Sequence, residues 1–212
     1  MRYDNAFIAI DTETGGLLSK IKKAVIDIAL TEVALVTVEN ESLEIIDKQS
    51  WLVKPYDENV EYTPRAAEVS GISKQMCEKE GLDIELVYKN VLKVLKKAKM
   101  GSKKPIIIMQ NKAFDTPFLE NLFAIFGDDF NNHIDRIEDT LFWARYKWIE
   151  KPNYGLGSIA EYCGLDLVQA HRALPDTEMT AKIWIHFMKS LRNEIGGSEQ
   201  QSVEKFREGF KF

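Results

Sequence analysis

Two acidic side chains near the start of the chain are spaced so that both could act on one chemical group. Asp11 and Glu13 follow the apolar run Phe7–Ile10 and are two residues apart. In an extended strand, residues i and i+2 point to the same face. Two carboxylates at one point repel each other unless a cation or a proton lies between them. The spacing therefore predicts a site that holds a cation or a shared proton.

Two further acids and a histidine lie beside predicted helix starts. Asp115 follows a second apolar run, and His171 and Asp176 flank the start of a long helical pattern. Taken singly, each has a structural explanation, because Asp often caps a helix and a lone His is more often structural. Taken together with Asp11 and Glu13, they form a suitable set for two divalent cations, which prefer oxygen ligands. Such a pair can activate a water and stabilise the leaving oxygen of a phosphodiester.

The rest of the pattern supplies the elements that would position these residues. β-Branched or alternating segments predict three antiparallel strands, at residues 6–11, 24–38 and 44–53. A short, continuously apolar run predicts a central strand covered on both faces, at residues 105–109. Apolar residues at helical spacing predict helices at residues 83–99, 116–126, 139–148, 156–162 and 173–191. This order of elements indicates an α/β or α+β domain.

Length and composition indicate one globular domain outside membranes. The chain has 212 residues, of which 45% are hydrophobic and 29% are charged. No apolar run approaches the roughly 20 residues that span a bilayer, and the N-terminus has no signal-peptide pattern, so we expect a cytoplasmic protein. Cys77 and Cys163 are expected to be reduced thiols. The net charge of −5 does not exclude a nucleic-acid partner, because bound cations would offset acids in a metal site.

Three short motifs resemble those of the DEDDh family of 3′→5′ exonucleases. They are IDTETGG at 10–16, NKAFD at 111–115 and HRALPD at 171–176, in the family's order. The connecting segments at 51–73 and 139–145 are also similar. The likeness runs from about Phe7 to Leu191, and within the family it is strongest to ribonuclease T and the proofreading exonuclease subunits. The three motifs jointly are specific, whereas each alone is weak.

The resemblance implies a ribonuclease H-like α/β fold. Its central mixed sheet would have five strands, the first three antiparallel, and helices would flank it. Residues 1–195 would form the exonuclease domain and residues 196–212 a C-terminal tail, either loosely attached or partner-binding. The implied activity removes 5′-mononucleotides from the 3′ ends of single-stranded DNA or RNA. The implied cofactor is a pair of Mg²⁺ ions, which Mn²⁺ could replace because the ligands are all oxygens.

The resemblance also assigns roles to the five motif residues. Asp11, Glu13, Asp115 and Asp176 would bind the metal ions. His171 would be the general base that takes a proton from the attacking water, since an unperturbed His pKa of about 6.5 leaves it neutral at working pH.

Four further residues are implied to contact the nucleic acid. Thr14 and Gly15 would hold the terminal ribose, although a simple tight turn also explains them. Leu17, or its neighbour Leu18, would wedge under the terminal bases. Phe114 would pack on a sugar or base, although core packing beside Asp115 explains it equally well.

The chain departs from the family pattern at several positions. Leu17 and Val69 stand where ribonuclease T has aromatic residues, so we expect a different base preference, since stacking contributes about 1–3 kcal/mol per base. Gln110 in Met109-Gln110-Asn111 replaces a more familiar His. Tyr154 could replace the catalytic His, as a Tyr does in a sister class, but His171 stands at the expected spacing.

Lysines crowd the segment KVLKKAKMGSKK, which includes Lys96 and Lys97. Such a run is usually a solvated helix face. The alternative is a phosphate-binding patch, which in ribonuclease T serves the partner subunit and would here imply a homodimer. Two other functions stay open: a nucleic-acid-binding or polymerase-associated module without catalysis, and a structural domain anchored by its C-terminal tail.

Overall fold

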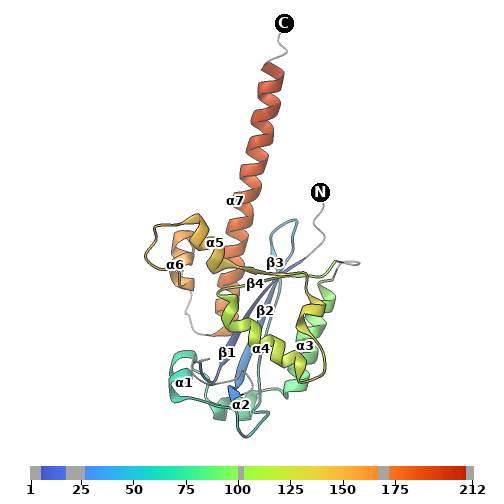
Figure 1. The fold of residues 1–212 in the computed structure, drawn as a ribbon, viewed down its shortest axis with the longest axis vertical. Helices are drawn as coiled ribbons and strands as arrows, with labels where there is room; N and C mark the ends of the chain where they lie inside the picture. Colours follow the sequence, from blue (N-terminus) through green and yellow to red (C-terminus); the bar gives the residue numbers. More distant parts are fainter. Residues whose placement is uncertain (1–5, 18–26, 100–102, 167–171, 209–212) are drawn as a thin grey trace.

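Five strands form one mixed sheet that carries helices on both faces (Figure 1). This computed structural model describes residues 6–17, 27–99, 103–166 and 172–208, with side chains as far as residue 193. The strands are β1 (Phe7–Thr14), β2 (Leu30–Val38), β3 (Ile45–Leu52), β4 (Ile106–Met109) and β5 (Ile137–Asp139). The helices are α1 (Pro64–Ser70), α2 (Lys74–Glu80), α3 (Ile84–Lys97), α4 (Lys112–Ala124), α5 (Thr140–Lys147), α6 (Leu156–Tyr162) and α7 (Ala173–Glu208).

The strand order is β3-β2-β1-β4-β5. Strands β3, β2 and β1 are antiparallel to one another, and β4 and β5 run parallel to β1. The predicted α/β fold, with a mixed five-stranded sheet whose first three strands are antiparallel, is confirmed. The first three strands follow one another as hairpins, whereas each parallel strand is reached through a helical connection.

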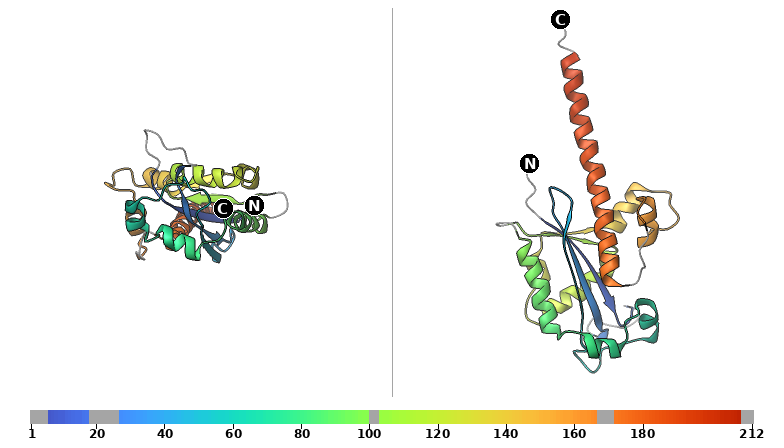
Figure 2. Two further views of the ribbon diagram at one scale, coloured as in Figure 1. Left: turned by 90° about the horizontal axis from the view of Figure 1, so that it is seen from below. Right: turned by 180° about the vertical axis from the view of Figure 1, so that it is seen from behind.

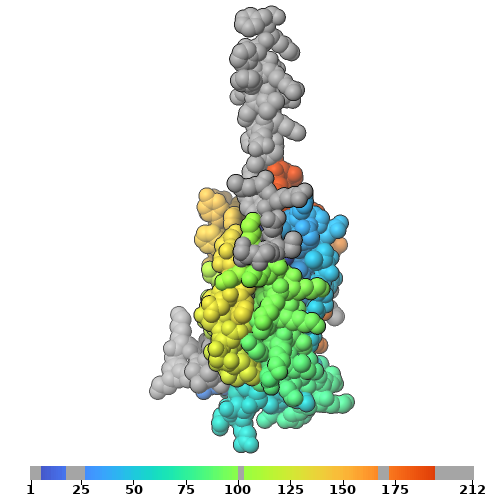
Figure 3. Space-filling model, turned by 90° about the vertical axis from the view of Figure 1, so that its right-hand side faces the viewer, coloured from blue at the N-terminus to red at the C-terminus, as the bar shows by residue number. Residues whose placement is uncertain are grey.

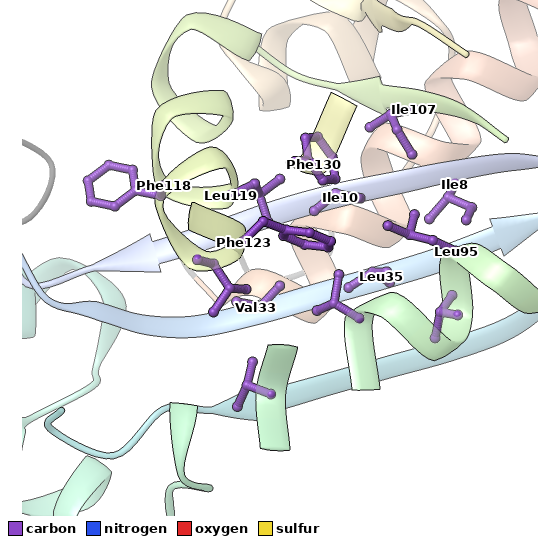
Figure 4. Close-up of a cluster of buried hydrophobic side chains, with 14 of the residues drawn as sticks. Ile8, Ile10, Val33, Leu35, Leu95, Ile107, Phe118, Leu119, Phe123 and Phe130 are labelled. Atoms are coloured by element: carbon purple, nitrogen blue, oxygen red, sulfur yellow. The ribbon is translucent and has the colours of Figure 1, made fainter. Parts of the chain in front are cut away.

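Alternation along β1 divides its side chains between two hydrophobic cores. Ile8 and Ile10 pack with α3 and α4 on one face, together with buried residues of β2 (Figure 4). Phe7 and Ala9 pack on the other face with residues of α5, α6 and α7. Seen from behind, the sheet lies between α3 and α7 (Figure 2). The parity of a β1 residue therefore decides which helices it meets.

Two helices have bounds that differ from the prediction. Helix α4 begins at Lys112 rather than at 116, because Asn111 takes a left-handed conformation (φ 66°) as its N-cap. Helix α7 was expected to end at Leu191, and this was wrong, since its backbone is helical to Glu208 (Figure 1). The pair Gly196-Gly197 costs the helix about 1 kcal/mol per glycine, but good helix formers flank it.

The surface of α3 carries exposed lysines at positions 89, 93, 96 and 97. Figure 3 shows this helix, in green, on an exposed face of the molecule. Within the described ranges, none of the helices combines the length and apolar character needed to cross a membrane. Cys77 and Cys163 are both free thiols, as expected.

Candidate active site

Three of the predicted acids meet beyond the apolar part of β1. Asp11 and Glu13 continue the parity of Phe7 and Ala9, so both side chains lie on the face of the sheet that α7 covers. Asp176 comes from the first turn of α7. One carboxylate oxygen from each of Asp11, Glu13 and Asp176 lies within 4.8 Å of the other two. Three oxygen donors this close form a set that suits a hard divalent cation.

Asp115 reaches the site from the opposite layer of the fold. The pairing of β1 with β4 ends at Ala9, so none of the described strands pairs with the later part of β1 on that side. There the backbone N–H of Thr12 donates to Asp115 Oδ1 at 2.9 Å, and the Thr12 hydroxyl donates to the same oxygen at 2.7 Å. Asp115 is only 2% exposed. It is therefore held to β1 by two hydrogen bonds and does not cap α4, whose N-cap is Asn111.

A residue that the sequence analysis did not single out holds the turn before Asp115. Asp139, at the end of β5, accepts hydrogen bonds from the backbone N–H groups of Asn111 (3.0 Å) and Lys112 (3.2 Å). It also accepts from the N–H of Leu141 at 2.9 Å, which caps α5. One carboxylate thus fixes the starts of two helices. An Asp directly before a helical pattern is a recognised capping signal and could have pointed to it.

Gln110, one of the departures from the family pattern, joins β4 to the following helices. Its side-chain carbonyl accepts from the Thr140 hydroxyl, and its amide donates to the backbone carbonyl of Tyr154 at 3.1 Å. The Tyr154 hydroxyl donates to the backbone carbonyl of Trp148. Beside these residues lies a pocket of about 550 Å³. Its lining is Gln110, Asn111, Leu141, Arg145, Pro152, Asn153, Tyr154, Gly155 and Leu156.

Burial and mutual repulsion raise the pKa values of the clustered acids. The pKa of Asp11 lies well above its ordinary value, first because the group is buried and then because Asp115 and Glu13 repel its charge. Burial, followed by repulsion from Asp176, raises the pKa of Glu13 to about 7. Burial also raises the pKa of Asp115 to about 7, although the bonds from Thr12 oppose the shift. Protons or a cation must therefore relieve the cluster, so the residues fit a divalent metal.

Glu32 and Arg172 form an ion pair next to the cluster, and the sequence analysis singled out neither. Glu32 lies opposite Glu13 in the register of β1 and β2, and it is 2% exposed. Its carboxylate accepts from Arg172 Nε at 3.1 Å and Nη2 at 3.2 Å. It also accepts from the backbone N–H of Ala173 at 3.2 Å. The available signal was a single acid in a strand that is otherwise nearly all apolar.

Gly15 is held on both sides by neighbouring backbone. Its N–H donates to the Ala29 carbonyl at 2.8 Å, and its carbonyl accepts from the Thr63 N–H at 2.7 Å. A Cβ atom at this position would lie 2.1 Å from the carbonyl oxygen of Glu61. The glycine is therefore required by close approach of the backbone.

The other residues predicted to contact nucleic acid differ in their exposure and contacts. The Thr14 hydroxyl donates to the carbonyl of Gly16 at 2.7 Å, which closes the turn after β1. The Leu17 side chain is 75% exposed, so it is accessible to a ligand. Phe114 is half-buried and its ring lies 5.6 Å from that of Phe118, which fits the core-packing explanation in part. His171 and Leu18 fall outside the described residues.

Comparisons with known proteins identify the family of this chain. Residues 8–184 match the family RNase_T, described as Exonuclease. The chain is 27% identical over 208 residues to a PolC-type DNA polymerase III of Thermotoga petrophila, covering 97% of this chain but 14% of the polymerase. A polymerase of the same type from Staphylococcus aureus is 27% identical over 202 residues, which are 95% of this chain and 12% of that protein. This chain thus spans a small fraction of these relatives.

Solved structures share the fold at lower identity. The nuclease domain of 3′hExo bound to rAMP, a DEDDh family member, superposes with a TM-score of 0.71 at 18% identity, covering 89% of this chain and 94% of that one. E. coli Exonuclease I in complex with a dT13 oligonucleotide superposes with a TM-score of 0.69 at 18% identity, covering 85% of this chain and 40% of that one.

Proposed function

Because this chain belongs to the RNase_T family of exonucleases, we propose that it removes 5′-mononucleotides stepwise from the 3′ ends of single-stranded nucleic acid. The observation that carries this proposal is the meeting of Asp11, Glu13 and Asp176 within 4.8 Å. Asp115, tied to the same strand through Thr12, completes the set of four acids. A binding module without chemistry would not need four partly or fully buried acids whose charges repel.

The proposed cofactor is a pair of Mg²⁺ ions, which Mn²⁺ could replace. Asp11, Glu13 and Asp176 would hold them directly, and Asp115 would lie beside them. When bound, such ions activate a water and stabilise the oxygen that leaves the phosphodiester. The raised pKa values of Asp11 and Glu13 support this assignment, because a cation removes the repulsion that raises them.

The chain's own residues would place the substrate and move the proton. We assign His171 as the base that accepts a proton from the attacking water. The backbone N–H and carbonyl of Gly15 are already bonded within the protein, so Gly15 would hold the terminal ribose by van der Waals contact and not by hydrogen bonds from these groups. Thr14 closes the same turn. Leu17, being exposed, and Phe114, at the start of α4, would contact the terminal bases.

We propose that the pocket beside Gln110 also binds the nucleic acid. Arg145 and Asn153 line it with the half-buried Tyr154, and the Arg145 guanidinium lies 5.8 Å from the Tyr154 ring centre. A guanidinium and amides suit a phosphate, and an aromatic ring suits a base. The pocket would therefore hold part of the strand upstream of its 3′ end.

The lysines of α3 lie on the face of the sheet away from α7, Asp11 and Glu13. Lys89 pairs with Glu85 at 2.6 Å and Lys97 with Asp47 at 4.0 Å, which favours the solvated-face explanation. In a homodimer, these lysines would serve the partner's site. Changing Lys96 and Lys97 to Ala tests this: a salt dependence of cleavage equal to that of the wild type excludes the phosphate-binding patch.

A cleavage assay tests the proposed function. End-labelled single strands of DNA and RNA are incubated with Mg²⁺, and the products of the wild type and Asp176→Asn are compared. We expect mononucleotide release from a 3′-labelled strand and a shortening ladder from a 5′-labelled strand, by the wild type only. Glu178→Gln, an acid two residues further along α7 that pairs with Lys48 and Lys182, is the matched control and should cleave normally. Equal digestion by Asp176→Asn contradicts the assignment.

The similarity to PolC-type DNA polymerases favours DNA as the substrate and suggests action on ends made during DNA synthesis. Faster cleavage of RNA than of DNA in the same assay would reverse this preference. Absence of cleavage on both, with tight strand binding, would favour the alternative of a non-catalytic module.

A further inference from the structure

We propose that Glu32 and Arg172 are positioning residues, which fix the first turn of α7 so that Asp176 stays with Asp11 and Glu13. This inference rests on the proposed function, since it concerns how the same acids are kept in place. Neither residue belongs to the four metal-binding acids. Together they connect the middle of the sheet to the helix that supplies the third acid of the cluster.

The two carboxylate oxygens of Glu32 accept three hydrogen bonds. Two come from the fork of the Arg172 guanidinium and one from the backbone N–H of Ala173, at 3.1–3.2 Å. The first N–H groups of a helix have no partner within the helix. Glu32 therefore caps α7 from a neighbouring strand, and the two bonds from Arg172 restrict rotation about that cap.

Asp176 lies one turn beyond the capped N–H, on the same helix. Because a helix turn rises only about 5.4 Å, a shift of the capped residue is passed on to Asp176 almost unchanged. Glu32 is also opposite Glu13 in the strand register, so the residue that caps α7 and one acid of the cluster lie on neighbouring strands at the same level of the sheet.

A second ion pair between the sheet and α7 provides a contrast. Lys48 of β3 bonds Glu178 at 2.7 Å, and Glu178 also pairs with Lys182. Lys48 and Arg172 are both 43% exposed, but the two acids differ, because the side chain of Glu178 is 26% exposed. Exposed pairs of this kind contribute little. The side chain of Glu32 is 3% exposed, so losing its partner leaves a buried charge unpaired. Lys48→Ala is therefore the matched control for a contact on the same helix.

The test measures metal binding by the full chain, apart from cleavage. Mn²⁺ affinity is determined by isothermal titration calorimetry for Glu32→Ala, Arg172→Ala, the double variant and Lys48→Ala, and folding is checked by thermal melts. Removing residues that orient metal ligands typically weakens metal affinity by about 10- to 100-fold. We expect that loss for either single variant, no further loss in the double variant, and none for Lys48→Ala. Saturating Mn²⁺ should restore kcat, with KM for the oligonucleotide unchanged.

Two results overturn the proposal: wild-type Mn²⁺ affinity in folded Glu32→Ala, or an equal loss in Lys48→Ala. If Glu32→Ala does not fold, Glu32→Gln and Arg172→Lys carry the test, since each keeps part of the pairing and should show a smaller loss in the same direction. Wild-type Mn²⁺ affinity in both Glu32→Gln and Arg172→Lys refutes the proposal. Asp176→Asn shows which of the two claims fails. If Asp176→Asn binds Mn²⁺ with wild-type affinity, the proposed function fails. If Asp176→Asn loses affinity while the Glu32 and Arg172 variants keep it, only the positioning role fails.

Discussion

Replacing Gly15 by alanine tests whether the fold requires a glycine at this position. The new Cβ would lie 2.1 Å from the carbonyl oxygen of Glu61 and 3.1 Å from the Cβ of Ala29. The first of these distances is far inside van der Waals contact, and the oxygen belongs to backbone, whose carbonyl already accepts from the Ala29 N–H. The turn after β1 must therefore move away from these segments, and Glu13 lies two residues before it.

The expected cost follows from two contributions. Overpacking by one methyl group in a tight site costs about 1–3 kcal/mol. Displacement would also weaken the bonds from Gly15 to Ala29 and Thr63, each worth about 1 kcal/mol. Together these predict that Gly15→Ala lowers the free energy of unfolding by about 2–5 kcal/mol. For a chain of this size, that corresponds to a fall in Tm of roughly 4–20 °C.

Gly16→Ala is the matched control. A Cβ at Gly16 would lie 3.5 Å from Thr63 Cγ2 and 3.6 Å from Glu61 Oε2, which are ordinary contacts. Its free energy of unfolding should change by less than about 1 kcal/mol. Urea unfolding and exonuclease turnover are measured for both variants. If Gly15→Ala is as stable and as active as Gly16→Ala, the close approach does not constrain the site and the reasoning is refuted.

Three other changes probe the acids and their supports. In EDTA, the Tm should fall as pH rises from about 4.5 to about 7, because Glu13 has a raised pKa and the native state holds a proton that the unfolded chain has lost. Mn²⁺ should remove this fall, Glu13→Gln should reduce it, and a flat profile in EDTA contradicts the electrostatics. Thr12→Val removes the 2.7 Å hydrogen bond to Asp115, which stabilises the charged carboxylate. If that bond is worth about 1 kcal/mol, the pKa of Asp115 and the pH midpoint of Mn²⁺ binding should rise by about 0.7 unit. An unchanged midpoint argues against this support. Asp139→Ala leaves three N–H groups without their acceptor and should lower the free energy of unfolding in urea by about 1–3 kcal/mol. The control Asp135→Ala, at an exposed position, should lower it by less than about 0.5 kcal/mol. Equal losses would contradict the capping of two helices by Asp139.

The features predicted correctly from the sequence depend on local patterns. The parity of Asp11 and Glu13 follows from strand geometry alone, and β1 places both on one face as predicted. The DEDDh exonuclease family, recognised from three short motifs, is confirmed by the match over residues 8–184. Asp176 falls in the first turn of α7, as its position at the end of the HRALPD motif indicated.

The features that the sequence did not reveal depend on contacts between distant segments. Strand β5 has only three residues, and its place in the sheet is set by pairing with β4. Asp139 gains its second role because that pairing brings it to the start of α4. Glu32 and Arg172 are 140 residues apart in the chain, so no spacing rule could join them. A buried charge in an apolar strand is a signal that a partner exists, but it does not identify the partner.

The most direct measurement of the central claim is a crystal structure with Mn²⁺ and a short single-stranded oligonucleotide. Anomalous difference density locates the manganese independently of the protein. The account predicts peaks within coordination distance of the carboxylates of Asp11, Glu13 and Asp176, with the 3′ end of the strand beside them. Manganese absent from this cluster, or a strand whose 3′ end lies elsewhere, would contradict it.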